Sequence, residues 1–159
     1  MTVYVDVSHP DLVPEAVLDL IQRQSAARPS ENMLFTVSPA TLSLYRRGLR
    51  NPVPCSQPEA DEINQFIGAE LGPGDYLMSA RADCTYCDRT LTLYDVFVSG
   101  RKRHGDEFIR RFMGNGAHLQ VAAADDAMPV TCTNCDTVNE LATGKAFPVH
   151  YSGGTYGYC

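Results

Sequence analysis

Cys84-Thr85-Tyr86-Cys87 and Cys132-Thr133-Asn134-Cys135 are the two stretches on which the fold depends. Each places two thiols three positions apart on a tight turn, which is how one half of a tetrahedral four-cysteine metal site is usually built. The insert between the two stretches is much longer than the roughly 15–20 residues of the commonest two-turn zinc pattern. The sequence therefore predicts that four cysteines meet around one cation and that the insert folds into a structure of its own.

The metal predicted at this site is one zinc ion. Zinc prefers tetrahedral coordination by thiolates and has no redox chemistry of its own. Iron in a rubredoxin-like site would use the same four ligands and is the less favoured alternative. A catalytic zinc would keep an open coordination position, which four thiolates do not leave. The predicted ion is therefore structural, and its binding free energy would become folding free energy.

The two turns resemble those of zinc ribbons, in which two Cys-x-x-Cys turns at hairpin tips hold one ion. The resemblance covers the two turns and the strand expected after the first one. Zinc ribbons usually carry glycine after the second cysteine, where this sequence has Asp88 and Asp136. Aspartate tolerates the left-handed conformation better than most residues, so both turns can still form. The resemblance implies a β-rich part whose metal ligands are Cys84, Cys87, Cys132 and Cys135.

Other uses of the six cysteines have less support. Three disulfides would suit an exported protein, and no export signal is visible. A thioredoxin-type redox pair normally opens a helix, whereas a β-rich run follows Cys87. Cys55 lies in a proline-rich connector, where an exposed thiol is plausible, and Cys159 could reach a metal site or stay mobile. A nucleophilic thiol needs a base, and nothing distinguishes the candidates His9, His104, His118 and His150.

The composition is that of an ordinary globular protein, with 44% hydrophobic residues and a formal net charge of −6. No apolar run approaches the roughly 18 residues of a membrane span, so no membrane association is expected. Because the first residues lack the features of a signal peptide, we expect a cytoplasmic location. The negative charge disfavours non-specific nucleic-acid binding, which requires Lys and Arg facing phosphates.

One basic segment runs against this overall balance. It begins at Arg101-Lys102-Arg103-His104 and includes two further arginines shortly afterwards. Charge runs mostly face water, and Asp106 and Glu107 are well explained as favourable charges at a helix N-terminus. Arginine is also enriched in protein interfaces. The candidate partner-binding residues are therefore Arg101, Lys102, Arg103, Arg110 and Arg111.

The first half of the chain is predicted to combine strands and helices. Alternation of Val3, Val5 and Val7 indicates a strand, and 33–37 is a second one. Helices are expected to start near Pro14 and Pro39, the latter capped by Ser38. A third helix is predicted over 59–71, after an extended connector with three prolines at 51–58.

The second half is predicted to be richer in strands. The expected strands are 76–78, 90–98, 118–121, 128–131 and an edge strand near 147–150, with a short helix at 105–114. The strand at 90–98 is favoured because that segment is rich in β-branched and aromatic residues. The predicted fold is α+β, with a helical N-terminal half (1–74) and a zinc-ribbon-like part (75–159) with an inserted helix. A single compact domain over 1–159 is the alternative.

Three functional hypotheses follow from these features. The favoured one is a small zinc-binding protein that acts as a binding or adaptor module for another protein, through the basic segment or the tyrosine-rich tail. The second is an enzyme whose pocket lies between the two parts and uses Cys55 or a histidine. The third is a nucleic-acid-binding zinc ribbon that would use the basic segment.

Overall fold

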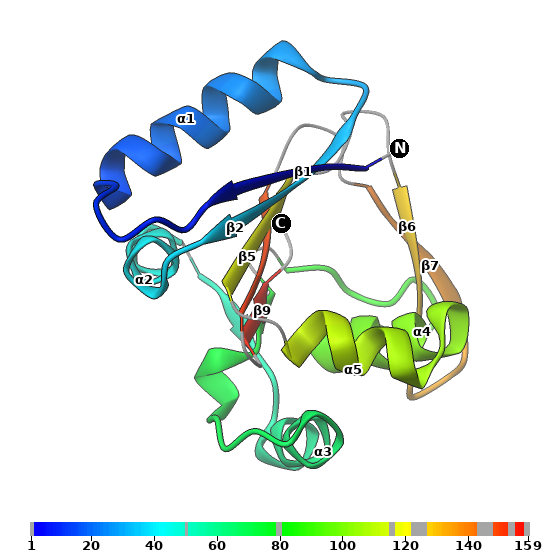
Figure 1. Ribbon diagram of the computed structural model, residues 1–159. Helices are drawn as coiled ribbons and strands as arrows, with labels where there is room; N and C mark the ends of the chain where they lie inside the picture. Colours follow the sequence, from blue (N-terminus) through cyan, green and yellow to red (C-terminus); the bar gives the residue numbers. More distant parts are fainter. Residues whose placement is uncertain are drawn as a thin grey trace.

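The computed structural model describes residues 2–49, 51–78, 81–114, 117–121, 127–142, 148–152 and 155–157. Helices and strands are mixed in this part of the chain, which confirms the α+β class (Figure 1). The division of the chain after residue 74 stays a prediction. None of the helices in the described ranges is long and apolar enough to cross a membrane.

The N-terminal elements form a strand–helix–strand unit followed by a helix. Strands β1 (Thr2–Val7) and β2 (Asn32–Val37) pair in parallel, and α1 (Pro14–Ala27) connects them. Helix α2 (Pro39–Arg47) follows, and the Ser38 hydroxyl caps it by accepting a hydrogen bond from the Thr41 amide at 3.2 Å. All four elements lie where the sequence predicts them. Their inner faces form a hydrophobic cluster of Val7, Val17, Ile21, Met33, Phe35, Val37 and Leu42.

Strands from the C-terminal half complete the sheet that β1 and β2 begin. The strand order is β1-β2-β5-β8-β9, with β5 (Ala117–Val121), β8 (Pro148–Ser152) and β9 (Thr155–Gly157) all antiparallel to their neighbours. The predicted strand near 147–150 corresponds to β8, although Phe147 lies outside the described residues. The expectation that it forms the edge is wrong, because the last described strand, β9, pairs with its outer side.

The proline-rich connector contributes to a two-stranded sheet that is separate from the five-stranded one, and the third helix follows it. Strand β3 (Val53–Pro54) pairs with β4 (Leu77–Met78), and α3 (Gln57–Ile67) lies between them in sequence. Ser56 and Glu59 form a capping box at the start of α3. The helix ends earlier than predicted because Gly68 takes a left-handed φ of 74°, which terminates it. A short 3-10 turn, η1 (Pro73–Asp75), leads into β4.

The strand predicted over 90–98 is wrong, because most of this segment belongs to helix α4 (Leu93–His104). Asp95 starts the helix by accepting a hydrogen bond from the Thr92 amide at 2.8 Å. Leu93, Val96 and Phe97 are buried on one side of it, at spacings of three and four residues. The cap and this buried face outweigh the intrinsic β-preference of the segment, which depends strongly on context.

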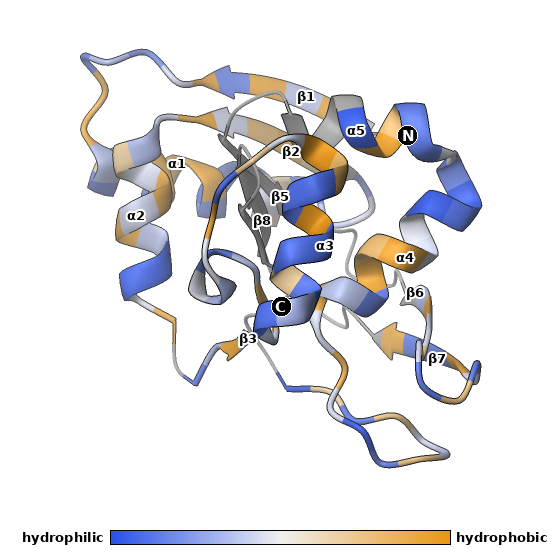
Figure 2. Ribbon diagram, turned by 90° about the horizontal axis from the view of Figure 1, so that it is seen from below, coloured by the Kyte–Doolittle hydropathy of each residue, from blue (hydrophilic) through white to orange (hydrophobic). Residues whose placement is uncertain are grey.

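Helix α5 (Asp106–Gly114) and strand β6 (Ala127–Thr131) lie where the sequence predicts them, whereas strand β7 (Val138–Ala142) was not predicted. Helix α5 has Asp106 and Glu107 in its first turn, as expected for charges that favour a helix N-terminus. Strands β6 and β7 pair antiparallel, and the second Cys-x-x-Cys turn joins them. Along α4, the residues change from mainly hydrophobic to hydrophilic toward its last turn (Figure 2).

Helix α4 lies beside β6 (Figure 1). Two of its side chains bond to the backbone of β6 and a third bonds to the backbone of the second cysteine turn. The spacing is regular, since four helix residues rise about 6 Å and two strand residues rise about 6.6 Å. We call this set the α4–β6 row. Its pairs are Asp95 Oδ1 with the Thr133 amide (2.9 Å), Ser99 Oγ with the Thr131 amide (2.9 Å), and Arg103 Nη2 with the Pro129 carbonyl (2.9 Å).

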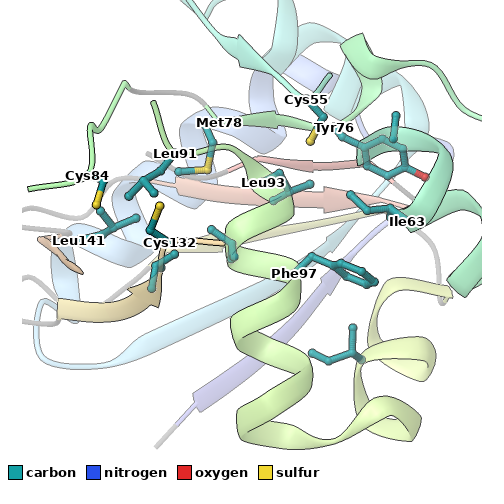
Figure 3. Close-up of a cluster of buried hydrophobic side chains, with 14 residues drawn as sticks. Cys55, Ile63, Tyr76, Met78, Cys84, Leu91, Leu93, Phe97, Cys132 and Leu141 are labelled. Carbon is teal, nitrogen blue, oxygen red and sulfur yellow. The ribbon is translucent and has the colours of Figure 1, made fainter. Parts of the chain in front are cut away.

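A second, larger hydrophobic cluster lies beneath α3, α4 and the cysteine turns (Figure 3). Its members come from segments far apart in the sequence, including Cys55, Ile63, Tyr76, Met78, Leu91, Phe97 and Leu141. Cys84 and Cys132, the first cysteine of each turn, are also buried in it. The core of this part of the molecule is therefore continuous with the four-cysteine site.

Replacing Ser99 with Ala tests the α4–β6 row. The substitution removes the acceptor of the Thr131 amide, so we expect the free energy of unfolding to fall by about 1 kcal/mol. Alanine also has a higher helix propensity than serine, and Ser43→Ala at an exposed position of α2 supplies the control for that effect. Urea denaturation measures both variants. Equal unfolding free energies for S99A and S43A would contradict the role of the row.

Candidate metal centre

The sulfur atoms of the two cysteine turns lie together. Cys84 Sγ is 3.5 Å from Cys135 Sγ, Cys87 Sγ is 3.7 Å from Cys132 Sγ, and all four lie within 4.8 Å of one another. Sulfurs placed tetrahedrally at about 2.3 Å from a zinc ion would be about 3.8 Å apart. The four cysteines therefore form a cluster that could hold a metal ion, as the sequence predicts.

The two turns have the same backbone conformation. In the first, the Cys84 amide donates to the Arg89 carbonyl at 2.8 Å, and the Asp88 amide donates to the Cys84 carbonyl at 3.0 Å. The second turn repeats both bonds at 2.9 Å each, from Cys132 to Thr137 and from Asp136 to Cys132. Asp88 and Asp136 both have φ of 62°, which confirms that aspartate takes the left-handed position here.

One side-chain oxygen from another element holds each turn. Asn139 Oδ1, on β7, accepts hydrogen bonds from the amide and the hydroxyl of Thr85 at 2.9 and 3.1 Å. Asp95 Oδ1, on α4, accepts from the amide and the hydroxyl of Thr133 at 2.9 and 2.8 Å. These four residues were not predicted from the sequence. The two threonines could have been noticed, because threonine directly follows the first cysteine in both turns.

Asn139 also reaches the sulfur cluster directly. Its side chain is buried, and Nδ2 lies 3.5 Å from Cys84 Sγ and 3.1 Å from the Thr137 carbonyl. The amide therefore connects the first turn, through Thr85 and Cys84, with the residue that follows the second turn. Such outer contacts orient metal ligands and tune their basicity.

The pKa values of the cysteines favour thiolates on the first turn. Backbone amides of Cys87 and Tyr86 lower the pKa of Cys84 to about 6, and Asn139 adds to this effect. Hydrogen bonds from the Arg89 amide and from Asn134 lower the pKa of Cys87. Thr137 lowers the pKa of Cys135, but desolvation and the sulfurs of Cys84 and Cys87 together raise it above its usual value. A thiolate disfavours ionisation of the sulfurs next to it, and a bound cation would offset this repulsion.

Asp95 connects the site to the helices. Its carboxylate is fully buried and accepts hydrogen bonds from Arg89 Nη1 at 2.6 and 2.7 Å, in addition to those from Thr92 and Thr133. Burial raises the pKa of Asp95, but Arg89 and the threonines lower it by more, so the carboxylate is the stable form. Arg89 Nη2 also donates to Glu59 Oε2 at 2.8 Å, which adds α3 to the network.

Cys55 does not belong to the sulfur cluster. Cys55 is only 4% exposed, so the expectation of an exposed thiol is wrong. Its side chain belongs to the larger hydrophobic cluster, and its amide donates to the Tyr76 carbonyl next to the β3–β4 pair. Burial, followed by the charge of Glu59, raises the pKa of Cys55 to about 12. Cys159 lies outside the described residues.

The sulfur cluster includes none of the histidines whose side chains the structure describes. His9 is exposed before α1, His104 is exposed at the end of α4, and His118 and His150 lie at adjacent register positions of β5 and β8. Arg101, Lys102 and Arg103 are in the last turn of α4, and Arg110 is in α5. The side chain of Arg111 is outside the described part. Whether this segment binds a partner stays a prediction.

A groove of about 600 Å³ lies between the first turn of α1, helix α2, and Gly74 and Leu77. The described residues that line it include no cysteine and no histidine. Whether the protein is an enzyme stays a hypothesis.

Comparison with known proteins gives one match. A family model described as a domain of unknown function (DUF8243) matches residues 48–156, more than half of the chain. The chain belongs to this family. No curated protein and no solved structure shows a significant match. The DUF8243 segment begins where α2 ends, and it contains all four clustered cysteines and every residue of the larger hydrophobic cluster.

Asp95→Asn tests the central carboxylate of this DUF8243 chain. The variant removes one of the two carboxylates that pair with the partly buried Arg89 and leaves only Glu59, so we expect the free energy of unfolding to fall by roughly 2 kcal/mol. Asp19→Asn breaks an exposed pair with Arg23 on α1 and should change it by less than about 0.5 kcal/mol. Denaturation at neutral pH compares the two. A D95N variant as stable as D19N would disprove the network's importance.

Asn139→Ala tests the buried amide beside Cys84. The variant removes the acceptor for Thr85 and the donor to sulfur, so we expect metal affinity to fall by about 10–100-fold. Glu140→Ala changes the adjacent exposed residue of β7 and should leave the affinity unchanged. Competition with a chromogenic zinc chelator measures both. Equal affinities for N139A and the wild type would show that the amide has no part in holding the ligands.

Proposed function

We propose that this protein is a small zinc-binding module with a structural four-cysteine site, and that its role is to bind another protein. The observation that carries the proposal is the gathering of four sulfurs within 4.8 Å of one another, from two turns far apart in the sequence. Such a cluster crosslinks the two ends of the insert when a metal is bound. The insert contains α4 and α5, so the metal would stabilise the helices as well as the turns.

Zinc is the ion that this donor set favours. The donors are four sulfurs and no oxygen or nitrogen, a combination typical of structural zinc and of iron. The matched conformations of the two turns support a zinc-ribbon-like site, with iron in a rubredoxin-like site as the alternative. Cys84 and Cys132 are 1% and 0% exposed, and four thiolates complete a tetrahedral shell. This supports a structural ion rather than a catalytic one.

A binding role is favoured over the enzyme hypothesis by the state of Cys55. A nucleophilic cysteine acts as its thiolate, and burial opposes that form when it raises the pKa to about 12. The five cysteines in the described ranges are free thiols. This fits a reducing compartment, so a cytoplasmic location is part of the proposal.

Metal analysis of the purified chain tests the zinc proposal. We expect one zinc ion per chain by native mass spectrometry, and cobalt substitution should give the absorption bands of tetrahedral thiolate coordination. Cys132→Ser should lose the metal and the cooperative unfolding transition, because the shell is then incomplete. Cys55→Ala, which changes a cysteine of the same core outside the cluster, should keep the metal.

Three results would contradict this proposal. One iron ion per chain would replace zinc by the rubredoxin-like alternative. A wild-type chain that binds no metal, or that unfolds at the same temperature after chelation, would remove the structural role. For the binding role, C55A expressed in cells should form reproducible crosslinks to another protein that C132S does not form. Identical crosslinks from both variants would show that partner binding does not depend on the metal site.

A further inference from the structure

We infer that the basic surface formed by the end of α4 and by α5 docks an acidic segment of the partner protein, an inference that rests on the protein-binding role proposed above. The basic surface consists of Arg101, Lys102, Arg103 and Arg110, with the exposed ring of Phe108 beside them. In Figure 2 the hydrophilic turn that joins the two helices marks its position.

The distribution of charge is the first support. Residues 101–111 contain five basic and two acidic side chains, whereas the whole chain has a net charge of −6. Positive charge is therefore concentrated on one short segment of an acidic protein. A surface of this kind attracts a negatively charged partner and discriminates against basic ones.

The packing of the arginines is the second support. The guanidinium carbons of Arg101 and Arg110 lie 4.2 and 4.4 Å from the centre of the same Phe66 ring. Asp106 balances Arg101, with hydrogen bonds of 2.9 and 3.0 Å. No ion pair in the described part of the chain involves Arg110, whose Nε donates to the Phe66 carbonyl at 3.3 Å. The charges of Asp106 and, more weakly, Glu62 act on Arg101, so Arg110 is the cation on this ring that an incoming carboxylate can balance.

The basic surface is also ordered before any partner arrives. One contact fixes Arg103, from Nη2 to the Pro129 carbonyl, and the Phe66 ring fixes Arg101 and Arg110. Fixing long side chains in advance reduces the conformational entropy that binding must overcome. Guanidinium groups held in this way can bind carboxylates through paired hydrogen bonds. Phe108 is 51% exposed and adds apolar area next to the charges.

A short acidic segment fits this surface better than a nucleic acid. A nucleic acid carries closely spaced phosphates along its whole length, and the negative charge of the remaining chain would repel those beyond the basic surface. At physiological salt a charge is felt over about 8 Å, so a few local carboxylates respond mainly to the basic surface. The charge balance therefore favours an acidic peptide.

Binding of a labelled peptide of eight glutamates to the full-length, zinc-loaded chain tests this inference. Fluorescence anisotropy should show binding that weakens as salt increases. The double variant Lys102→Glu and Arg103→Glu should bind at least tenfold more weakly. The single variant K102E should bind about threefold more weakly, and it is informative on its own because Lys102 is exposed and its loss should not disturb the fold.

The matched control is the double variant Arg23→Glu and Arg81→Glu. It has the same change in net charge at two exposed arginines of other elements, and it should bind within twofold of the wild type. No anisotropy change with the wild type, or equal weakening in the two double variants, would overturn the inference. Tighter binding of an eight-nucleotide oligothymidylate than of the peptide would also overturn it, in favour of a nucleic acid.

Native mass spectrometry of the same samples separates this inference from the proposed function. A zinc-loaded, folded wild type that does not bind the peptide would refute the docking surface and leave the zinc proposal intact. A chain that binds the peptide but holds no metal would support the surface and contradict the zinc module. The two failures are therefore distinguishable in one set of preparations.

Discussion

A single buried carboxylate, that of Asp95, connects the parts of the structure that matter for the metal site. It accepts hydrogen bonds from Arg89 after the first cysteine turn, from Thr92 at the start of α4, and from Thr133 in the second turn. An isolated charge in such a position would be very costly to bury. It is stable here only because all three donors are present together, so the two turns and the start of α4 depend on one another.

This dependence explains how a cysteine site can tolerate such a long insert. Bringing together two turns separated by many residues costs chain entropy, and that cost grows only slowly with length. The insert does not remain a loop. Helix α4 runs beside β6, is joined to it by a regular series of hydrogen bonds, and packs on the larger hydrophobic cluster. A bound metal, the buried carboxylate of Asp95 and the contact between α4 and β6 would therefore all hold the two cysteine turns together.

Much of this arrangement could be predicted from local sequence, and the failures have a common cause. The spacing of cysteines, the Ser38 cap and the aspartates at 88 and 136 depend on neighbouring residues, and each is found as predicted. The segment 90–98 and the exposure of Cys55 depend on what packs against them from elsewhere in the chain. Burial on one face turned a β-rich segment into a helix, and Cys55 is buried in the larger hydrophobic cluster although most of the connector around it is exposed or half-buried.

The position of the four-cysteine cluster limits how a metal bound there could influence anything outside the protein. Two of its sulfurs are buried, and a shell of four thiolates leaves no position for a substrate. Its influence can pass outward through the elements attached to it, and α4 is attached at regular intervals along its length. The last of these attachments, from Arg103 to the Pro129 carbonyl, is in the basic surface itself. A site that is chemically closed can in this way still determine whether a surface is correctly assembled.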